Sequence, residues 1–287
     1  MRLYVAHHDT IPLLRLRLGD GIQTVGMAYG EKKSLNGVNI SLHPAGHIIG
    51  SAMVRLSYKG QVAVISGDYH NTHSPYCTPL EIVPCHTFVT ESTFGIAPFK
   101  WKPEQEIMDE IANWIQFNQS DGRASVLICY ALGKAQRVIS ALSERFPMIY
   151  THNSVQQVQE CLRTYVPDIP RTEVITSQTP RKQIEGQIIV APPGILKGNW
   201  LQQLPVHRTA YLSGWAQLKS RPMARFVDTM IALSDHADFA GLESVCLATG
   251  AENFLTCHGY DKDFALHLRL LGKQATTLIP QPVLTLF

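Results

Sequence analysis

The sequence predicts an α/β protein in which one domain is interrupted by another. Three observations support this prediction: the first third is rich in β-prone runs, the middle alternates strands with helices, and the end returns to a strand–helix–strand pattern. With 287 residues, the chain is long enough for one large domain or two intermediate ones with a substantial core.

The first third contains short β-prone runs with polar residues at their ends. Residues 39–42, 52–58 and 61–66 are such runs, and the Lys-Gly pair at 59–60 makes a natural tight turn between the last two. Another strand is expected over residues 86–91.

Helices and strands alternate through the middle of the chain. Pro103 is expected at the first position of a helix over 104–118, where apolar residues recur at helical spacing until an Asp-Gly pair ends it. Elements of such lengths indicate an α/β unit with a mostly parallel sheet. The other expected elements are helices over 133–145 and 154–165, a helix after Phe239, and strands over 125–130, 148–151, 209–212, 231–233 and 253–257.

Composition is that of an ordinary globular protein. The hydrophobic fraction of 45% and the net charge of +2 say little about partners. The basic run Lys219, Arg221 and Arg225 is a weak candidate for contact with a nucleic-acid backbone and is more often a solvated face. Six cysteines without a C-x-x-C pair indicate reduced thiols in a cytoplasmic protein rather than a structural zinc knuckle. No apolar run reaches membrane-spanning length, so no membrane partner is expected.

Five polar residues share one property, which is a position at or just after the end of an expected strand. Strand ends at one edge of a sheet converge on a crevice, the usual place for a site in such folds. A hydrolytic zinc site uses imidazole and carboxylate ligands and leaves one position open for water. The five residues are His47, Asp68, Glu91, His236 and His258.

Each of these residues also has a purely structural explanation. A lone histidine such as His47 is more often a hydrogen-bonded structural residue than a ligand. Asp68 could stabilise a turn, Glu91 could be a surface charge, and His258 before a glycine could simply end a strand. Asp235 and Asp238 could be N-caps of the following helix. It is the set of five in order that favours a site.

The five residues lie in short motifs that follow one another along the chain. The motifs are Ala-Gly-His-Ile-Ile-Gly-Ser at 45–51, Gly-Asp-Tyr at 67–69, Glu-Ser-Thr-Phe-Gly at 91–95, Ser-Asp-His-Ala-Asp-Phe at 234–239 and Cys-His-Gly at 257–259. In order and spacing they resemble successive motifs of the β-CASP branch of metallo-β-lactamase-fold nucleases. Within that branch, the sequences around residues 83–95 and 130–138 are most similar to bacterial ligase-associated DNA exonucleases, which are related to messenger-RNA 3′-end processing factors.

The resemblance implies roles for the five residues. His47 would bind a first zinc ion, Asp68 would bridge two zinc ions, and His258 would bind the second. Glu91 and His236 would act beside the metals, with His236 protonating the leaving oxygen and Glu91 orienting it. Two metals that activate a water for attack on a phosphodiester fit this chemistry.

The resemblance also implies a fold and domain boundaries. The fold would be a metallo-β-lactamase αββα sandwich, incomplete at its N-terminus, with an inserted α/β β-CASP domain. The sandwich would comprise residues 1–95 and 231–287, and the β-CASP domain residues 96–230, closing over the metal cleft. Gly133 and Lys134 at a helix start would offer backbone N–H groups and a cation to a phosphate, and Arg137 shares that face. An ordinary glycine-initiated helix with a solvated lysine is an equally good explanation.

The chain departs from the family pattern in one respect. The H-x-H-x-D-H motif that supplies most zinc ligands in the family is absent, and His7-His8-Asp9 lacks its spacing. His70 and His73 lie near Asp68, and both are expected to be exposed loop histidines. Either the start is wrongly assigned or trimmed, or this is a true short form that has lost its metals.

These observations favour one function and leave two alternatives. We expect a zinc-dependent exonuclease on DNA or RNA, acting in DNA repair or RNA processing, with a DNA ligase or helicase as a candidate partner. Family likeness favours DNA, whereas a histidine at 258 is expected in RNA-processing members. The alternatives are a metal-poor, non-catalytic nucleic-acid-binding form and a small-molecule hydrolase, which is disfavoured because the large insert would roof the cleft.

Overall fold

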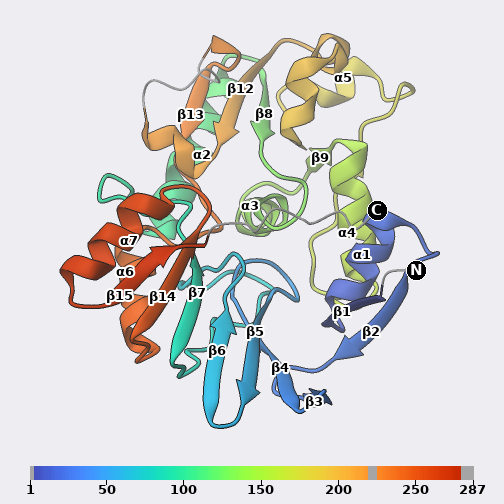
Figure 1. The fold of residues 1–287 in the computed structure, drawn as a ribbon. Coiled ribbons are helices and arrows are strands. Elements are labelled where there is room, and N and C mark those ends of the chain that lie inside the picture. Colours follow the sequence, from blue (N-terminus) through green and yellow to red (C-terminus); the bar gives the residue numbers. More distant parts are fainter. Residues whose placement is uncertain (1–2, 219–224, 279–287) are drawn as a thin grey trace, which may run out of the picture.

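Two large sheets form separate layers of the molecule, with helix α3 lying between them in the view of Figure 1. The structure is a computed structural model that describes residues 3–218 and 225–278. Lys219 and Arg221 of the basic run lie outside the described residues, and Arg225 is exposed.

The lower sheet in Figure 1 has seven strands in the order β15-β14-β7-β6-β5-β4-β3. Its first four strands in chain order pair antiparallel, and β6, β7, β14 and β15 pair parallel. Phe88 and Phe254 pack with Phe264 of α7 in a core on one face. The elements are β3 (Lys32–Leu35), β4 (Val38–Pro44), β5 (Ala52–Tyr58), β6 (Gln61–Ile65), β7 (Thr87–Glu91), α6 (Phe239–Ala248), β14 (Asn253–Cys257), α7 (Asp261–Leu270) and β15 (Gln274–Thr277).

The upper sheet has six strands in the order β10-β9-β11-β8-β12-β13, and all of them are parallel. Its central strands are apolar on both faces: Leu127 faces one buried cluster and Val126 the other, as expected where both faces of a parallel sheet are covered. The elements are α2 (Glu104–Ser120), β8 (Ala124–Ile128), α3 (Lys134–Ser143), β9 (Ile149–Thr151), α4 (Asn153–Arg163), β10 (Glu173–Val174), α5 (Arg181–Ile184), β11 (Ile188–Ala191), β12 (His207–Leu212) and β13 (Thr229–Ile231), with 3-10 turns η1 (Pro193–Lys197), η2 (Trp200–Gln203) and η3 (Gly214–Gln217).

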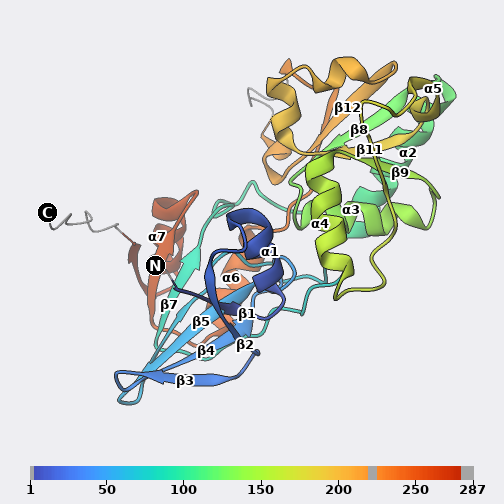
Figure 2. The same ribbon diagram turned by 90° about the vertical axis from the view of Figure 1, so that its right-hand side faces the viewer.

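The N-terminal segment packs against the upper unit rather than extending the lower sheet. β1 (Leu3–His7) and β2 (Gln23–Met27) form a two-stranded parallel sheet, joined by α1 (Thr10–Leu18). Leu13 of α1 and Leu162 of α4 belong to one apolar cluster, and Figure 2 shows the two helices side by side. The sequence pattern did not predict this arrangement.

Most of the elements expected from local patterns are present. The Lys59-Gly60 turn has the positive φ angles of 46° and 82° that a tight hairpin requires, and the parallel sheet in the middle of the chain is confirmed. Pro103 lies one residue before α2, in extended backbone, and not at its first helical position. Strand β11 was not predicted, although it occupies the middle of its sheet.

The fold is therefore mixed α/β with several sheets. The αββα sandwich and the missing N-terminal part stay predictions, as do the domain boundaries at residues 95 and 230. None of the described helices has the length and apolarity needed to cross a membrane.

Candidate metal centre

Tight backbone turns hold His47 at the end of β4. Gly46 and Gly50 on either side have φ angles of 71° and 74°, in the left-handed region that favours glycine. A Cβ on Gly46 would lie 2.3 Å from the carbonyl oxygen of His70, so no larger residue fits there. The hydroxyl of Ser51 accepts hydrogen bonds from the N–H groups of His47 and Ile48, at 3.1 and 3.2 Å. The Ala-Gly-His-Ile-Ile-Gly-Ser sequence thus builds a rigid loop around one imidazole.

Three predicted site residues come together at the ends of strands. The donor atoms of His47, Asp68 and His236 all lie within 4.8 Å of one another. His47 Nε2 is 3.8 Å from Asp68 Oδ2, and the two imidazole rings are 4.6 Å apart at their centroids. Asp68 follows β6 and His236 follows β13, so residues from both sheets contribute.

The hydrogen bonds of the two imidazoles decide which nitrogens are free. His47 Nδ1 lies 2.8 Å from the carbonyl oxygen of Asp235, which can only accept, so Nδ1 carries the proton and Nε2 keeps its lone pair. His236 Nδ1 lies 2.8 Å from Glu91 Oε2, which leaves Nε2 as the nitrogen open to the group. A histidine that ligates a metal typically donates its other N–H to a carbonyl or carboxylate in this way.

Glu91 and His236 form a buried, charge-coupled pair. The side chain of Glu91 is 1% exposed and also accepts the Tyr69 N–H at 2.7 Å. Burial acts to raise the pKa of this carboxyl, but the hydrogen bond and charge of His236 outweigh it and hold the pKa below its usual value. For His236, burial acts to lower the pKa, and the hydrogen bond and charge of Glu91 raise it above the usual value. Each partner therefore stabilises the charged form of the other.

These residues fit a divalent metal ion. Two imidazole nitrogens and one carboxylate form the three-ligand set of a catalytic zinc site, which leaves a further position for water or substrate. Asp68 is 46% exposed at its side chain, so such an ion would be reached from solvent. Among the residues that the structure describes, this is the single group of three or more His, Cys, Asp or Glu side chains placed to hold a metal ion.

His258 lies outside this group. Its side chain is exposed, and its backbone adopts a φ of 63°. The Ser92 hydroxyl donates to the His258 carbonyl oxygen at 2.7 Å, and a Cβ on Gly259 would meet the Thr93 backbone at 2.5 Å. The Cys-His-Gly sequence thus forms a close-packed turn after β14, and metal binding by His258 stays a prediction.

Lys134 and Arg137 are buried rather than solvated. Each is 4% exposed and faces Asp235, with Nζ of Lys134 at 3.6 Å and Nη1 of Arg137 at 3.5 Å from its carboxylate oxygens. Burial acts to raise the pKa of Asp235, but the charges of Lys134 and Arg137 outweigh it and lower that pKa. Arg137 also donates to Glu104 at 2.6 Å. The expectation of a solvated lysine is wrong, and phosphate contact by Gly133, Lys134 and Arg137 stays a prediction.

Asp235 contacts the candidate site in a way that the sequence analysis did not predict. It was considered only as a helix cap, a role that Asp238 fulfils by accepting the Gly241 N–H at 2.8 Å. The carboxylate of Asp235 instead joins α3 to the loop before α6, while its carbonyl fixes the tautomer of His47. The only hint in the sequence was the presence of two acidic residues where one cap suffices.

The expectation that His70 is exposed is wrong. Its side chain is 2% exposed, because the loop carrying His236 folds over it and the Ala237 N–H donates to the Tyr69 carbonyl at 2.9 Å. Burial lowers the pKa of His70 to about 3, so its imidazole is neutral at neutral pH. Its Nε2 forms a hydrogen bond of 2.7 Å with Thr72 Oγ1. His73 is exposed as predicted.

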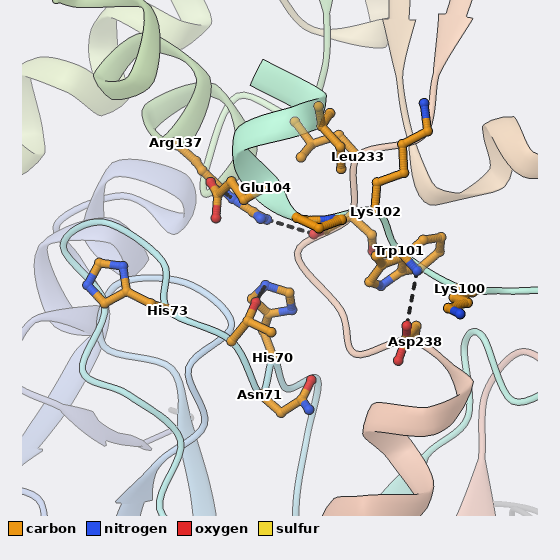
Figure 3. A pocket seen from close by; sticks show the side chains of 14 residues that line it. His70, Asn71, His73, Lys100, Trp101, Lys102, Glu104, Arg137, Leu233 and Asp238 are labelled. Atoms are coloured by element: carbon orange, nitrogen blue, oxygen red, sulfur yellow. Dashed lines mark hydrogen bonds and ion pairs between the residues drawn. The ribbon is translucent and has the colours of Figure 1, made fainter. Parts of the chain in front are cut away.

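His70 borders a cavity of ≈ 630 Å³ that includes none of the three donor residues. Figure 3 shows Trp101, Arg137 and Asp238 around it, with the Trp101 main-chain N–H donating to Asp238 at 3.0 Å. Arg137 and Ser234 line its wall, and Arg137 donates a hydrogen bond to the Ser234 carbonyl oxygen at 2.7 Å.

Comparison with known proteins gives relatives of two kinds. The chain is 27% identical over 281 residues to a probable DNA ligase of Opitutus terrae, 26% identical over 174 residues to endoribonuclease ysh1 of Aspergillus fumigatus, and 25% identical over 196 residues to RNase aCSPSF2 of Saccharolobus solfataricus. The chain is a relative of the β-CASP nucleases. No family model matches it.

These relatives are all longer than the region they share with this chain. The matches cover 95%, 56% and 62% of this chain, but only 27%, 18% and 39% of the ligase, ysh1 and aCSPSF2 respectively. Among solved structures, a protein of unknown function from Enterococcus faecalis matches with a TM-score of 0.66 at 10% identity, over 96% of this chain and 73% of its own. That likeness supports the fold alone.

Proposed function

We propose that this chain is a metal-dependent nuclease that hydrolyses phosphodiester bonds in DNA or RNA. The observation that carries the proposal is the His47–Asp68–His236 group, in which both Nδ1 atoms are engaged elsewhere and an Nε2 atom of each ring is left for the centre. The names of the relatives, two ribonucleases and a DNA ligase, support nucleic acid as the substrate. The metallo-β-lactamase and β-CASP architecture is part of this proposal.

Zinc is the metal that the donor set favours, since two imidazoles and one carboxylate suit it better than they suit magnesium or calcium. His47 and Asp68 would hold the ion. When bound, a divalent ion supplies Lewis-acid polarisation of a phosphoryl oxygen and a water of lowered pKa.

Glu91 keeps the imidazole of His236 in place. Its ionised carboxylate accepts the Nδ1 proton and so directs Nε2 toward His47 and Asp68. His236 Nε2 would serve either as the third ligand or, when protonated, as the acid that gives a proton to the leaving oxygen. It cannot do both at once, because a protonated nitrogen has no lone pair.

Replacement of His236 separates these two uses. The purified chain, stripped with a chelator and then supplied with zinc, is expected to cleave a labelled single-stranded oligonucleotide. His236→Gln should abolish cleavage in either case; zinc content falls if His236 is a ligand and is retained if it is the proton donor. Unimpaired cleavage by His236→Gln would overturn the proposal.

The action from an end, the role in DNA repair or RNA processing and the partnership with a ligase or helicase are finer parts of the proposal. A nested series of oligonucleotides labelled at either end tests the first of these: stepwise shortening supports an exonuclease, whereas internal fragments indicate an endonuclease. Oligonucleotide binding without zinc uptake or cleavage by the wild-type chain would favour the non-catalytic form.

A further inference from the structure

The six-stranded sheet carries a second cavity that the metal centre does not use. It has a volume of ≈ 640 Å³ and lies where β8, β9 and β11 end, between the loops that follow these three strands. The crevice outside the carboxyl ends of parallel strands is the usual ligand site of open α/β sheets. The volume is within the range of small-ligand pockets.

Aromatic rings line this cavity. Tyr130, just after β8, is 59% exposed, so its ring is accessible to a ligand in the cavity. Trp200 of η2 is half-buried and packs edge-on against His152, with 5.1 Å between ring centroids and an interplanar angle of 68°. A Cβ on Gly194 or Gly198 would meet no atom within 4 Å, so the space beside these rings is open.

The polar groups of the cavity are neutral. His152 Nδ1 accepts the Ser154 N–H at 3.1 Å, so its proton is on Nε2, and burial lowers the pKa of His152, which keeps it uncharged at neutral pH. Within the described ranges, the Asn199 amide has no hydrogen-bond partner. No Asp, Glu, Lys or Arg is among the residues that line the cavity. A flat group with hydrogen-bonding edges fits these walls better than a phosphate does.

The cavity is connected to the metal centre through one short loop. The loop from Tyr130 reaches Gly133, where a Cβ would lie 2.4 Å from Ile48, the neighbour of His47. Lys134 Nζ lies 5.2 Å from the Tyr130 ring centroid and 3.6 Å from Asp235, whose carbonyl holds His47. The loop that borders the cavity is therefore also in contact with the segments that hold His47.

We infer that this cavity is a nucleobase subsite, in which a base of single-stranded nucleic acid stacks on Tyr130 and Trp200 and meets His152 and Asn199 at its edge. The inference rests on the proposed nuclease function, because it places the base of a substrate strand beside the scissile phosphate. The subsite would recognise the base of a nucleotide, whereas the metal group would act on the phosphate alone.

Oligonucleotide binding in the presence of a chelator tests the subsite without turnover. Tyr130→Ala and Trp200→Phe are each expected to weaken binding of a short single-stranded oligonucleotide, roughly 5- to 150-fold for complete loss of one stacked base and less for the phenylalanine. The matched control is Tyr58→Ala: Tyr58 is also exposed and also carries a lysine Nζ 5.2 Å from its ring, but it lies at the far end of β5. Binding by the control should equal that of the wild-type chain.

Abasic substitutions sharpen the test, because they need no change in the protein. Removing the base at one position of the oligonucleotide should weaken binding to the wild-type chain and have little further effect on Tyr130→Ala, as in a double-mutant cycle. DNA and RNA oligonucleotides of the same sequence show which backbone is preferred. Equal losses in both proteins at every abasic position, or unchanged binding by Tyr130→Ala, would overturn the subsite.

The proposed function is tested separately with bis(p-nitrophenyl) phosphate, a phosphodiester that has no base. The wild-type chain is expected to hydrolyse it when zinc is present. If the wild-type chain hydrolyses this substrate but Tyr130→Ala leaves oligonucleotide binding unchanged, the subsite is rejected and the nuclease function stands. If an abasic position weakens oligonucleotide binding but the wild-type chain does not hydrolyse bis(p-nitrophenyl) phosphate, the subsite is supported and the nuclease function is rejected.

Discussion

The strand ends of the two sheets differ in the chemistry they carry. At the seven-stranded sheet, the ends of β6 and β7 bring two carboxylates, Asp68 and Glu91, to one imidazole, and the loop after β13 of the other sheet adds His236. At the six-stranded sheet, Tyr130 and His152 line a cavity with no charged side chain. Under the proposed function, hydrolysis would take place where strand ends of both sheets meet, whereas recognition of a base would be confined to the six-stranded sheet.

Asp235 joins these two regions. Its carboxylate contacts Lys134 and Arg137 of α3, and its carbonyl contacts His47 of the seven-stranded sheet unit. This buried residue is therefore one of the links between the two regions, and changes at it are expected to be the most damaging.

Asp235→Asn should destabilise the fold by about 3–5 kcal/mol, because it leaves the buried Lys134 without its compensating charge and leaves Arg137 paired with Glu104 alone. Urea unfolding followed by fluorescence measures the change. Asp109→Asn is the matched control, since Asp109 also accepts a hydrogen bond from an arginine, at 2.6 Å, but on the surface. If Asp235→Asn lowers the free energy of unfolding no more than Asp109→Asn does, the link between the two regions is weak.

Glu91→Gln should lower cleavage by roughly 10²-fold while the fold persists, because an outer carboxylate that orients a site histidine typically contributes a factor of this order. The amide oxygen of glutamine still accepts the Tyr69 N–H, so the strand end keeps its shape. Steady-state rates on an oligonucleotide give the effect, and circular dichroism checks the fold. A rate within twofold of wild type would mean that the pair does not act in the reaction.

Gly133→Ala tests how closely the two regions approach each other. The residue has a φ of 84°, and its Cβ would lie 2.4 Å from Ile48, so a cost of about 1–3 kcal/mol is expected. Gly122→Ala controls for the backbone strain alone, since Gly122 has a φ of 68° with no atom within 4 Å of the new Cβ. Equal thermal shifts for the two variants would show that contact with Ile48 is unimportant.

The smallest expected effect concerns Asp228, which belongs to the six-stranded sheet and to neither site. Its carboxylate accepts hydrogen bonds from Thr209 N and Oγ1 at 2.7 and 2.8 Å. Burial acts to raise the pKa of Asp228, but these hydrogen bonds outweigh it and lower that pKa. Its stabilisation is present above the pKa of the unfolded chain and is lost as the pH falls through the lowered folded pKa. Asp228→Asn should cost less than about 1 kcal/mol at neutral pH, because the side chain is exposed, and nothing at acidic pH. A cost that grows on acidification would contradict this assignment.

Local sequence patterns predicted much of the fold but only part of the site. The hairpin at Lys59-Gly60 and the parallel sheet follow from signals a few residues long. The burial of His70 and the pairing of Asp235 with Arg137 depend on residues 98 or more positions away, or on how a distant loop folds, so no local signal reports them. Strand β11 was missed because four apolar residues between turns give too short a pattern.

The candidate metal group was predicted in part. The resemblance placed His236 beside the metals, and the structure brings it to His47 and Asp68, whereas metal binding by His258 stays a prediction. The order of motifs along the chain identifies relatives, but which strand ends meet is decided by the packing of the two sheets.

The central claim is that His47, Asp68 and His236 surround the metal ion on which catalysis depends. Zinc content after dialysis, measured by mass spectrometry for the wild-type chain, His47→Gln and His258→Gln, tests this most directly. The account predicts about one zinc ion per chain in the wild type and in His258→Gln, and loss of zinc together with cleavage in His47→Gln. Zinc that persists in His47→Gln, or is lost in His258→Gln, would contradict it.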